Sequence, residues 1–72
     1  MSLVERLRRN LRYYMAVQNW TQAKMAEKVG VCVQVVSDWL NGRRNPTLKH
    51  IEQMAEAFGV DPALLFAEKR TA

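Results

Sequence analysis

Apolar residues recur along most of the chain at the three- and four-residue spacing of an amphipathic helix. Five segments with this spacing can be recognised, and they cover about residues 2–18, 21–29, 32–41, 47–58 and 61–68. The first segment places four apolar side chains on one stripe: Leu3, Leu7, Leu11 and Tyr14. The fourth does the same with Leu48, Ile51, Met54, Ala55 and Phe58. The pattern therefore predicts five short helices.

Residues that favour helix ends stand at the predicted boundaries. Ser2 and Glu5 have the spacing of a capping box, and Thr21 is a good N-cap for the second helix. Gly30 follows that helix and can take the left-handed conformation in which many helices end. Asp61 is followed by a proline, which is typical of a helix start. The boundaries and the periodicity therefore agree.

Four valines lie close together at the start of the third segment: Val31, Val33, Val35 and Val36. Such a β-branched run favours a strand by propensity, but a lone strand would leave its backbone groups unpaired. Drawn as a helix over 32–41, the segment separates into two faces. The inner face comprises Cys32, Val36, Trp39 and Leu40, and the outer face comprises Val33, Gln34, Ser37, Asp38 and Asn41. We therefore expect an all-α fold.

Length and charge narrow the possible functions. The 72 residues allow one small domain spanning 1–72 and argue against a deep catalytic cleft. Residues 1–46 carry eight Lys and Arg against three Asp and Glu, whereas residues 47–72 carry three against four. A basic N-terminal part favours a polyanionic partner, nucleic acid before a membrane surface. A single cysteine excludes an internal disulfide and offers no metal-ligand cluster, so we expect no metal and no cofactor.

The stretch TQAKMAEKVGVCVQVVSDWLNGRRNP, followed by TLKHIEQMAEAFGVDPALLF, resembles the Cro/CI-like (XRE) helix-turn-helix repressors of phages and bacteria. The resemblance covers about residues 5–66. It rests on an ordered set of features: a short helix, a Gly30-Val31 turn, a second helix and an Asn41-Gly42 stop. The resemblance implies a compact five-helix lambda-repressor-like fold in which the helix at 32–41 enters the DNA major groove.

The resemblance also implies two sets of DNA-contacting residues. Base reading falls to Val33, Gln34, Ser37 and Asp38, and phosphate binding falls to Thr21, Gln22, Asn41, Arg43 and Arg44. A helix N-terminus at Thr21 suits a phosphate, because its first backbone N–H groups have no partner within the helix. An amide such as Gln34 can bond adenine through two hydrogen bonds, whereas Val33 offers only apolar contact, most simply to a thymine methyl group.

Several of these roles stay open at the level of sequence. Asp38 could accept a hydrogen bond from cytosine N4 and penalise misdocking, or it could be a surface charge that a basic domain tolerates. Gln22 and Arg44 could simply be solvated. Three arginines of the first helix are expected mainly on a solvated face: Arg6, Arg9 and Arg12.

The chain departs from the family pattern at several positions. Many members pair an Arg late in the first helix with a Glu before the Asn-Gly stop, and here Met15 and Leu40 stand at those positions. Exchanging a buried ion pair for apolar side chains is often neutral or stabilising, so we expect these two to touch. Cys32 stands where Ser or Thr commonly caps the third helix, and a thiol is a weaker acceptor. We expect this cysteine to be buried and inert, with a redox role as the alternative. Trp20 and Trp39 are expected in the core.

The leading function is therefore a sequence-specific regulator that binds double-stranded DNA, a repressor that occupies an operator. The alternative is an antitoxin or coactivator-like protein-interaction module with the same fold. His50 has neither a second ligand nor a positioned nucleophile, so we expect no enzyme and no small-molecule substrate. No apolar run approaches the length of a membrane span, and one cysteine suits a reducing compartment, so we expect a cytoplasmic protein. The resemblance implies that a bacterium or a phage encodes it.

The last predicted helix is the expected site of self-association. Regulators of this family usually bind palindromic half-sites as two-fold dimers. Leu64 and Leu65 cannot both point inward from so short a helix, and Phe66 adds a third apolar side chain. These residues are expected to form a symmetric homodimer contact. The alternative is that all three close the core of the monomer.

Overall fold

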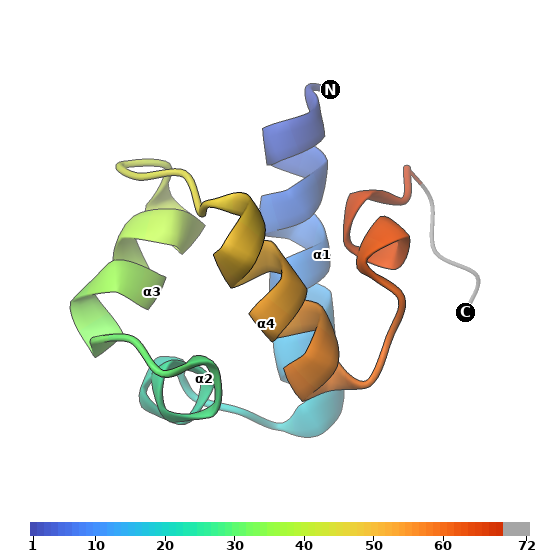
Figure 1. The fold of residues 1–72 in the computed structure, drawn as a ribbon. Coiled ribbons are helices and arrows are strands. Elements are labelled where there is room, and N and C mark those ends of the chain that lie inside the picture. The colour runs from blue at the N-terminus through green and yellow to red at the C-terminus, as the bar shows by residue number, and fades with distance from the viewer. Residues whose placement is uncertain (69–72) are drawn as a thin grey trace.

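The computed structural model describes residues 1–68. Four α-helices follow one another: α1 (Leu3–Gln18), α2 (Gln22–Val29), α3 (Val33–Asn41) and α4 (Leu48–Phe58). A short 3-10 helix, η1 (Pro62–Phe66), comes last. The described part of the chain contains no strand, so the all-α prediction holds there and the valine run is helical (Figure 1).

The predicted fifth α-helix over 61–68 is wrong in type and in length. Asp61 and Pro62 do open a helical segment, and the Asp61 side chain accepts a hydrogen bond from the Ala63 N–H. The segment ends after five residues, however, because Ala67 is already extended, with φ −61° and ψ 135°. The Ala67 N–H donates to the carbonyl of Leu64, three residues back, which is the bonding pattern of a tight 3-10 turn.

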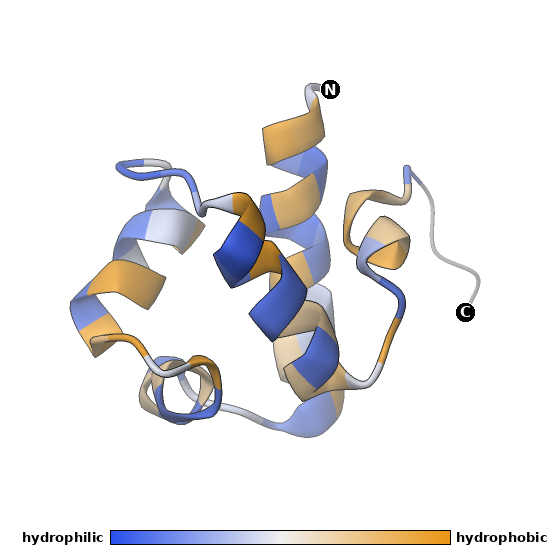
Figure 2. Ribbon diagram, in the orientation of Figure 1, coloured by the Kyte–Doolittle hydropathy of each residue, from blue (hydrophilic) through white to orange (hydrophobic). Residues whose placement is uncertain are grey.

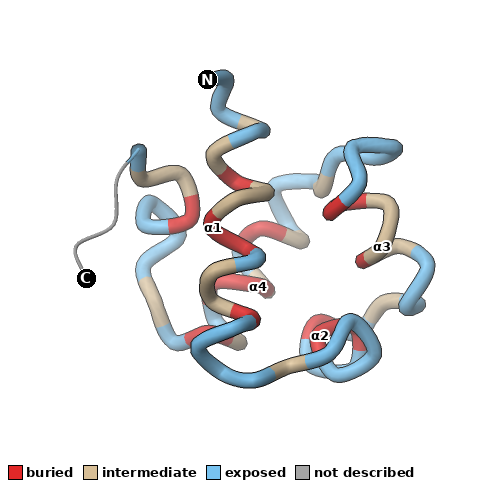
Figure 3. The backbone as a smooth tube through the Cα atoms, turned by 180° about the vertical axis from the view of Figure 1, so that it is seen from behind, coloured by how far each residue is buried: buried red, intermediate tan, exposed pale blue. Residues whose placement is uncertain are grey.

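The helices enclose one core. α1 packs against α3 on one side and η1 on the other, while α4 packs against α2 and η1, and α2 packs against α3. Figure 1 shows α4 crossing in front of α1, with the α2–α3 pair on one side and η1 on the other. Apolar residues recur along each helix, and the buried segments turn toward the middle of the molecule (Figures 2 and 3).

The core draws on every element. Its buried side chains are Leu7, Leu11, Met15, Met25, Ala26, Val29, Val36, Trp39, Leu40, Ile51, Met54, Ala55, Phe58 and Leu65. Two residues assigned to apolar stripes lie outside it, because Leu3 is 59% exposed and Leu48 is 80% exposed. Both stand at the first position of their helices, where no neighbouring element covers them.

Local capping fixes the helix starts as the sequence predicts. The Ser2 N–H donates to the Glu5 carboxylate at 2.9 Å, and the Glu5 N–H donates to the Ser2 hydroxyl at 3.2 Å. The hydroxyl of Thr21 accepts from the Lys24 N–H at 3.1 Å. Each bond satisfies a backbone donor that the first turn of a helix leaves without a partner.

A buried amide joins η1 to α1, and the apolar pattern gave no sign of it. Asn10 has 0% of its surface exposed. Its Nδ2 group donates to the carbonyl oxygens of Leu65 and Ala67, each at 2.9 Å. Arg9 adds a bond from Nη2 to the same Ala67 oxygen at 3.1 Å. Polar contacts from α1 therefore hold the C-terminal segment, together with the fully buried Leu65.

Aromatic rings close the side of the core near the α1–α2 connection. Trp20 stacks on Phe58 with ring centroids 5.1 Å apart, and Tyr14 lies 5.3 Å from the same ring. Trp20 is only half-buried, and the Lys28 ammonium lies 5.8 Å from its ring centroid. Trp39 is buried, with 1% exposed, as expected of a core aromatic. The connection that leads into α2 is therefore anchored to α4 through stacked rings.

Candidate nucleic-acid interface

A tight turn joins α2 to α3. Gly30 has φ 85°, in the left-handed region that a side chain would strain, and its N–H donates to the Ala26 carbonyl at 2.8 Å. The Val31 N–H donates to the same oxygen at 3.0 Å. These two bonds, from successive residues, terminate α2. The next helix, α3, begins at Val33 and packs directly on α2. This arrangement is a helix-turn-helix.

The two faces of α3 separate much as the helical period predicts. Val36, Trp39 and Leu40 are buried. On the other face Val33 is 49% exposed, Gln34 is exposed, and Ser37 and Asp38 are half-buried. α3 thus presents a largely polar surface to solvent, with one apolar side chain near its start.

Cys32 is the exception to the predicted division, because it is exposed and not buried. It occupies the N-cap position, one residue before the helix, where its side chain does not share the inner face. No side-chain hydrogen bond caps α3 there, which confirms that the thiol is a poorer cap than Ser or Thr. The first turn of α3 is held by its backbone and by the burial of Val36.

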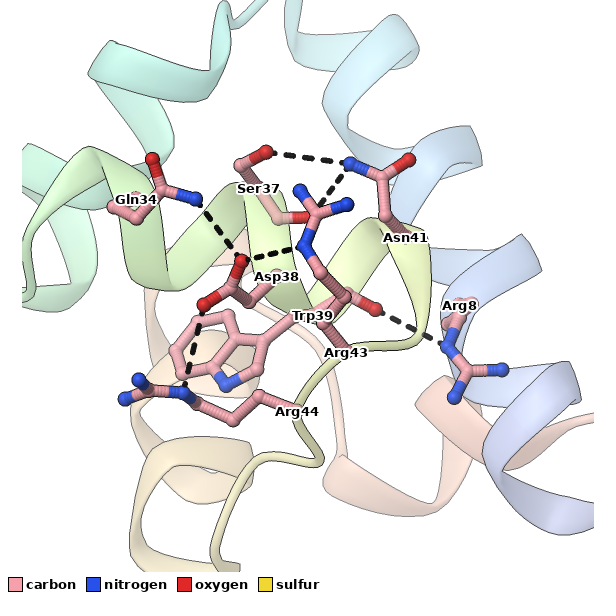
Figure 4. A network of polar contacts seen from close by, with 8 residues as sticks. All are labelled: Arg8, Gln34, Ser37, Asp38, Trp39, Asn41, Arg43 and Arg44. Atoms are coloured by element: carbon pink, nitrogen blue, oxygen red, sulfur yellow. Dashed lines mark hydrogen bonds and ion pairs between the residues drawn. The ribbon is translucent and has the colours of Figure 1, made fainter.

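Asp38 stands at the centre of a polar network on the outer face (Figure 4). Its Oδ1 accepts from Gln34 Nε2 at 3.0 Å and from Arg43 Nε at 3.1 Å. Its Oδ2 lies 3.7 Å from Arg44 Nε. The hydrogen bond from Gln34, then that from Arg43 and the positive charges nearby, holds the pKa of the Asp38 carboxyl below its ordinary value.

The end of α3 is ordered by a second group of contacts. Asn41 Nδ2 donates to the Ser37 carbonyl at 2.9 Å and to the Ser37 hydroxyl at 3.2 Å. Gly42 then reverses the chain with φ 80°, and the N–H groups of Arg43 and Arg44 both donate to the Asp38 carbonyl, at 2.9 and 3.3 Å. The loop that carries the two arginines is thereby folded back against the last turn of the helix.

Two arginines of α1 bond the last carbonyls of α3. Arg8 Nε donates to the Trp39 oxygen at 3.1 Å, and Arg12 Nη2 donates to the Leu40 oxygen at 2.7 Å. The last four carbonyls of a helix have no partner within it, and a positive charge near that end also interacts favourably with the helix dipole. A Cβ atom added at Gly42 would lie 3.3 Å from the Arg8 guanidinium, so the glycine also makes room for this contact.

The expectation of a solvated arginine face on α1 is therefore wrong in part. Arg12 caps α3, Arg9 bonds the Ala67 and Glu68 carbonyls, and Arg6 is half-buried. The helical period alone places these arginines on the face away from the apolar stripe. The acceptors of Arg9 and Arg12 are backbone carbonyls on distant segments, which carry no signal in the amino-acid pattern.

An open hollow of about 330 Å³ lies beside the N-terminus of α2. Its lining consists of Arg12, Met15, Ala16, Trp20, Thr21, Gln22 and Leu40. Met15 and Leu40 thus line the same hollow, and both are buried in the core. The exposed Thr21 and Gln22 stand at the rim formed by the first turn of α2.

Comparison with known proteins agrees with this geometry. The model of the helix-turn-helix family matches residues 11–65, which include α2, the turn and α3. The chain belongs to the helix-turn-helix family. It is 37% identical over 54 residues to an uncharacterized HTH-type transcriptional regulator of Methanocaldococcus jannaschii, covering 75% of this chain and 82% of that protein.

A solved structure extends the likeness of this helix-turn-helix protein to three dimensions. The crystal structure of the hypothetical transcription factor NHTF from Neisseria superposes with a TM-score of 0.86 at 32% sequence identity. The alignment covers 92% of this chain and 76% of that one. Both relatives are transcription regulators by name, and the likeness confirms the XRE-type helix-turn-helix resemblance.

The helix-turn-helix places the sequence-predicted DNA contacts in two groups. Val33, Gln34, Ser37 and Asp38 share the outer face of α3, and Asn41, Arg43 and Arg44 follow at its C-terminal end. Thr21 and Gln22 lie at the start of α2.

Of the three residues predicted to face a second copy, Leu64 is 46% exposed and Phe66 is half-buried. Leu65 is fully buried, so it belongs to the core of the monomer.

Two features are absent among residues 1–68. No three His, Cys, Asp or Glu side chains gather there in a way that could hold a metal ion. No helix within this range is long and apolar enough to cross a membrane. His50 packs its ring 5.2 Å from that of Trp39, and its Nδ1 lies 3.1 Å from the Thr47 hydroxyl.

Proposed function

We propose that this helix-turn-helix protein is a transcription regulator that binds double-stranded DNA and represses by occupying an operator. Membership of the family and the two related regulators support the general part, DNA-binding transcription regulation. The observation that carries the specific part is the outer face of α3. It combines an exposed amide and small polar groups with two arginines in the loop that follows. We expect α3 to enter the major groove, which has room for one helix.

In this proposal the residues of α3 divide the recognition of bases between them. Gln34 bonds adenine through its amide, and Val33 contacts a thymine methyl group. Ser37 lies one turn further on and can donate or accept a hydrogen bond through its hydroxyl. Ser37 is tied to Asn41 by a 3.2 Å bond, so its hydroxyl is already oriented when DNA arrives.

Phosphate contacts at both ends of the motif fix its register on the duplex without reading sequence. At one end, Arg43 and Arg44 are 60% and 56% exposed, and Asn41 lies beside them at the end of α3. At the other end, the first turn of α2 offers backbone N–H groups and the positive end of the helix dipole, next to the exposed side chain of Gln22. Thr21 already caps this helix and adds a hydroxyl at the same place.

We further propose that two copies bind a palindromic operator. Leu64 is 46% exposed beside the half-buried Phe66. Their segment, η1, lies on the opposite side of α1 and α4 from α3 (Figure 1). An exposed apolar pair is small for a stable interface, so we expect weak association that a palindrome strengthens by supplying both half-sites at once. A regulator of this kind acts on DNA in the cytoplasm of a bacterium or a phage-infected cell.

One experiment tests the function directly. Duplexes with a random central region are incubated with the protein, and bound sequences are recovered over several rounds and read. We expect a motif with two-fold symmetry and half-sites about one helical turn apart. Affinity for the recovered duplex should fall steeply with salt, because bound phosphates release counterions. Recovery of sequences no different from the starting pool, together with the absence of salt-dependent duplex binding, would favour the protein-interaction module instead.

A further inference from the structure

One oxygen of the Asp38 carboxylate already accepts two hydrogen bonds within the protein. One oxygen accepts from Gln34 and from Arg43, at 3.0 and 3.1 Å, and the other faces Arg44 at 3.7 Å. The Asp38 side chain is only 14% exposed, although it lies on the outer face of α3. Oδ1 therefore has little acceptor capacity left, while Oδ2 is held near the Arg44 cation at a distance longer than a hydrogen bond. These contacts point to a role for Asp38 in orienting its partners.

The bond to Gln34 decides how that amide is presented. A carboxylate can only accept hydrogen bonds, so it holds the nitrogen end of the Gln34 amide toward itself. One N–H of Gln34 is used by Asp38, which leaves the second N–H and the amide oxygen. An adenine in the major groove requires one donor, for N7, and one acceptor, for its amino group. The two atoms that remain on Gln34 are this pair.

The contacts of Asp38 with Arg43 and Arg44 likewise leave the terminal Nη groups of both arginines unused by the carboxylate. Both guanidinium groups face Asp38 through Nε, so the terminal Nη groups point away from the carboxylate (Figure 4). The backbone N–H groups of Arg43 and Arg44 also donate to the Asp38 carbonyl, which folds the loop onto the helix. A guanidinium that is already oriented loses less conformational freedom when it binds a phosphate.

We propose that Asp38 is a positioning residue that assembles the DNA-reading surface before DNA is bound. Its carboxylate fixes the polarity of the Gln34 amide and aims the two loop arginines at phosphates. Base choice at the position that Gln34 reads then depends on a residue that does not itself contact the base. This inference rests on the proposed function and names the residue that determines specificity within it.

Three variants separate this role from the alternatives. Asp38→Ala removes both the acceptor and the charge. Asp38→Asn keeps an oxygen that can accept from Gln34 Nε2 but loses the charge that holds the arginines. Glu56→Ala is the matched control, because it removes one exposed carboxylate from α4, away from the α3 network. Each variant is tested as the full chain, by selection from the random pool and by titration of the best and of a random duplex.

The positioning role predicts a distinct result for each variant. Asp38→Ala should broaden base choice at the position that Gln34 reads, and should reduce the ratio of affinities for the best and random duplexes on the order of tenfold. Asp38→Asn should keep most of that base preference but weaken the phosphate contacts. Glu56→Ala should leave the selected motif as it is in the unaltered protein. In a Gln34→Ala background, Asp38→Ala should no longer change base choice at that position, because the two residues act as one unit.

The Gln34 side chain can also be observed without DNA. In the free protein, Asp38→Ala should move the side-chain amide resonances of Gln34, whereas Glu56→Ala should not. Unchanged Gln34 resonances, or a motif that depends on Gln34 but not on Asp38, would overturn the positioning role and leave the proposed function standing. Loss of preference at a cytosine position alone would make Asp38 a base-reading residue, against the proposal. Failure of the unaltered protein to bind any duplex would overturn the proposed function and this inference together.

Discussion

Asn10 allows a stringent test of how the C-terminal segment is held. The residue has 0% exposure, and its amide donates to the carbonyls of Leu65 and Ala67, each at 2.9 Å. Asn10→Ala removes these two bonds, and also the longer contact to the Leu64 carbonyl at 3.4 Å, while keeping a good helix former in α1. The Ala67 oxygen retains the Arg9 guanidinium, so the Leu65 carbonyl suffers the greater loss.

The magnitude follows from these contacts. Each bond contributes roughly 1 kcal/mol net, and a buried carbonyl that loses its donor costs about 1–3 kcal/mol. We therefore expect Asn10→Ala to lower the free energy of unfolding by about 2–4 kcal/mol. A domain of this size has a total stability of about 4–11 kcal/mol, so the midpoint of thermal unfolding should fall by more than 10 °C, roughly.

Urea unfolding followed by circular dichroism measures this change. The control is Gln18→Ala, which removes an exposed amide from the last turn of the same helix and should change stability by about 0.5 kcal/mol or less. If Asn10→Ala costs no more than Gln18→Ala, then the amide does not hold η1. The burial of Leu65 would in that case be sufficient on its own.

The same position makes a prediction about pH. Asn10→Asp places a carboxyl group against carbonyl oxygens, where only its protonated form can donate a hydrogen bond. Its pKa in the folded state should therefore lie above its value in the unfolded chain. Relative to the unaltered protein, the variant should be most stable below the unfolded pKa and should lose stability as pH rises toward the folded pKa. A stability difference independent of pH would contradict the burial of this side chain.

Three further predictions concern recognition, assembly and stability. Gln34→Ala should relax base choice at one or two positions and cost about 1–3 kcal/mol on the best duplex, whereas Arg43→Ala should weaken all duplexes alike and reduce the salt slope by about 1, both measured by titration. Leu64→Glu, at an exposed position, should abolish any concentration-dependent dimer in sedimentation while leaving the helical signal intact. Cys32→Ser should raise stability by about 0.5–1 kcal/mol in urea unfolding, because a hydroxyl can cap α3 where the thiol does not.

Each of these predictions has an outcome that would count against it. Equal losses for Gln34→Ala and Arg43→Ala on specific and random DNA would remove the distinction between base reading and phosphate binding. A strict monomer bound to a single asymmetric site would contradict the dimer on which Leu64→Glu depends. No gain from Cys32→Ser would mean that the existing bond from the Val35 N–H to the Cys32 carbonyl, at 3.0 Å, already satisfies the first turn.

The sequence predicts most helix boundaries because capping is local. Ser2 and Thr21 cap the helices that follow them through residues three positions away, so the signal lies within one short window. The valine run at the start of α3 was resolved by a different argument, the absence of a partner for a strand. Because no second strand is predicted anywhere in the chain, the valine run is predicted to be helical, and it is.

The remainder of the fold depends on contacts between distant segments. Asn10, Arg8 and Arg12 all donate to backbone carbonyls of other elements. Every residue has a backbone carbonyl, so no pattern of side chains indicates which carbonyl will accept a hydrogen bond from a distant side chain. The same reason explains the error at the C-terminus, where the apolar residues of η1 were recognised but Leu65 could not be distinguished from Leu64. Only the approach of α1 and α4 decides which of the two is covered.

The two ends of α3 are held differently, and this bears on recognition. At its C-terminal end, Arg8 and Arg12 bond the last carbonyls, and the loop folds back onto Asp38. At its N-terminal end, Cys32 supplies no side-chain cap. The C-terminal end, near the arginines proposed to bind phosphate, is thus held by more contacts than the first turn, which carries Val33 and Gln34. The bond from Gln34 to Asp38, one turn further on, is therefore a side-chain contact that links the turn proposed to read bases to the better-held end of the helix.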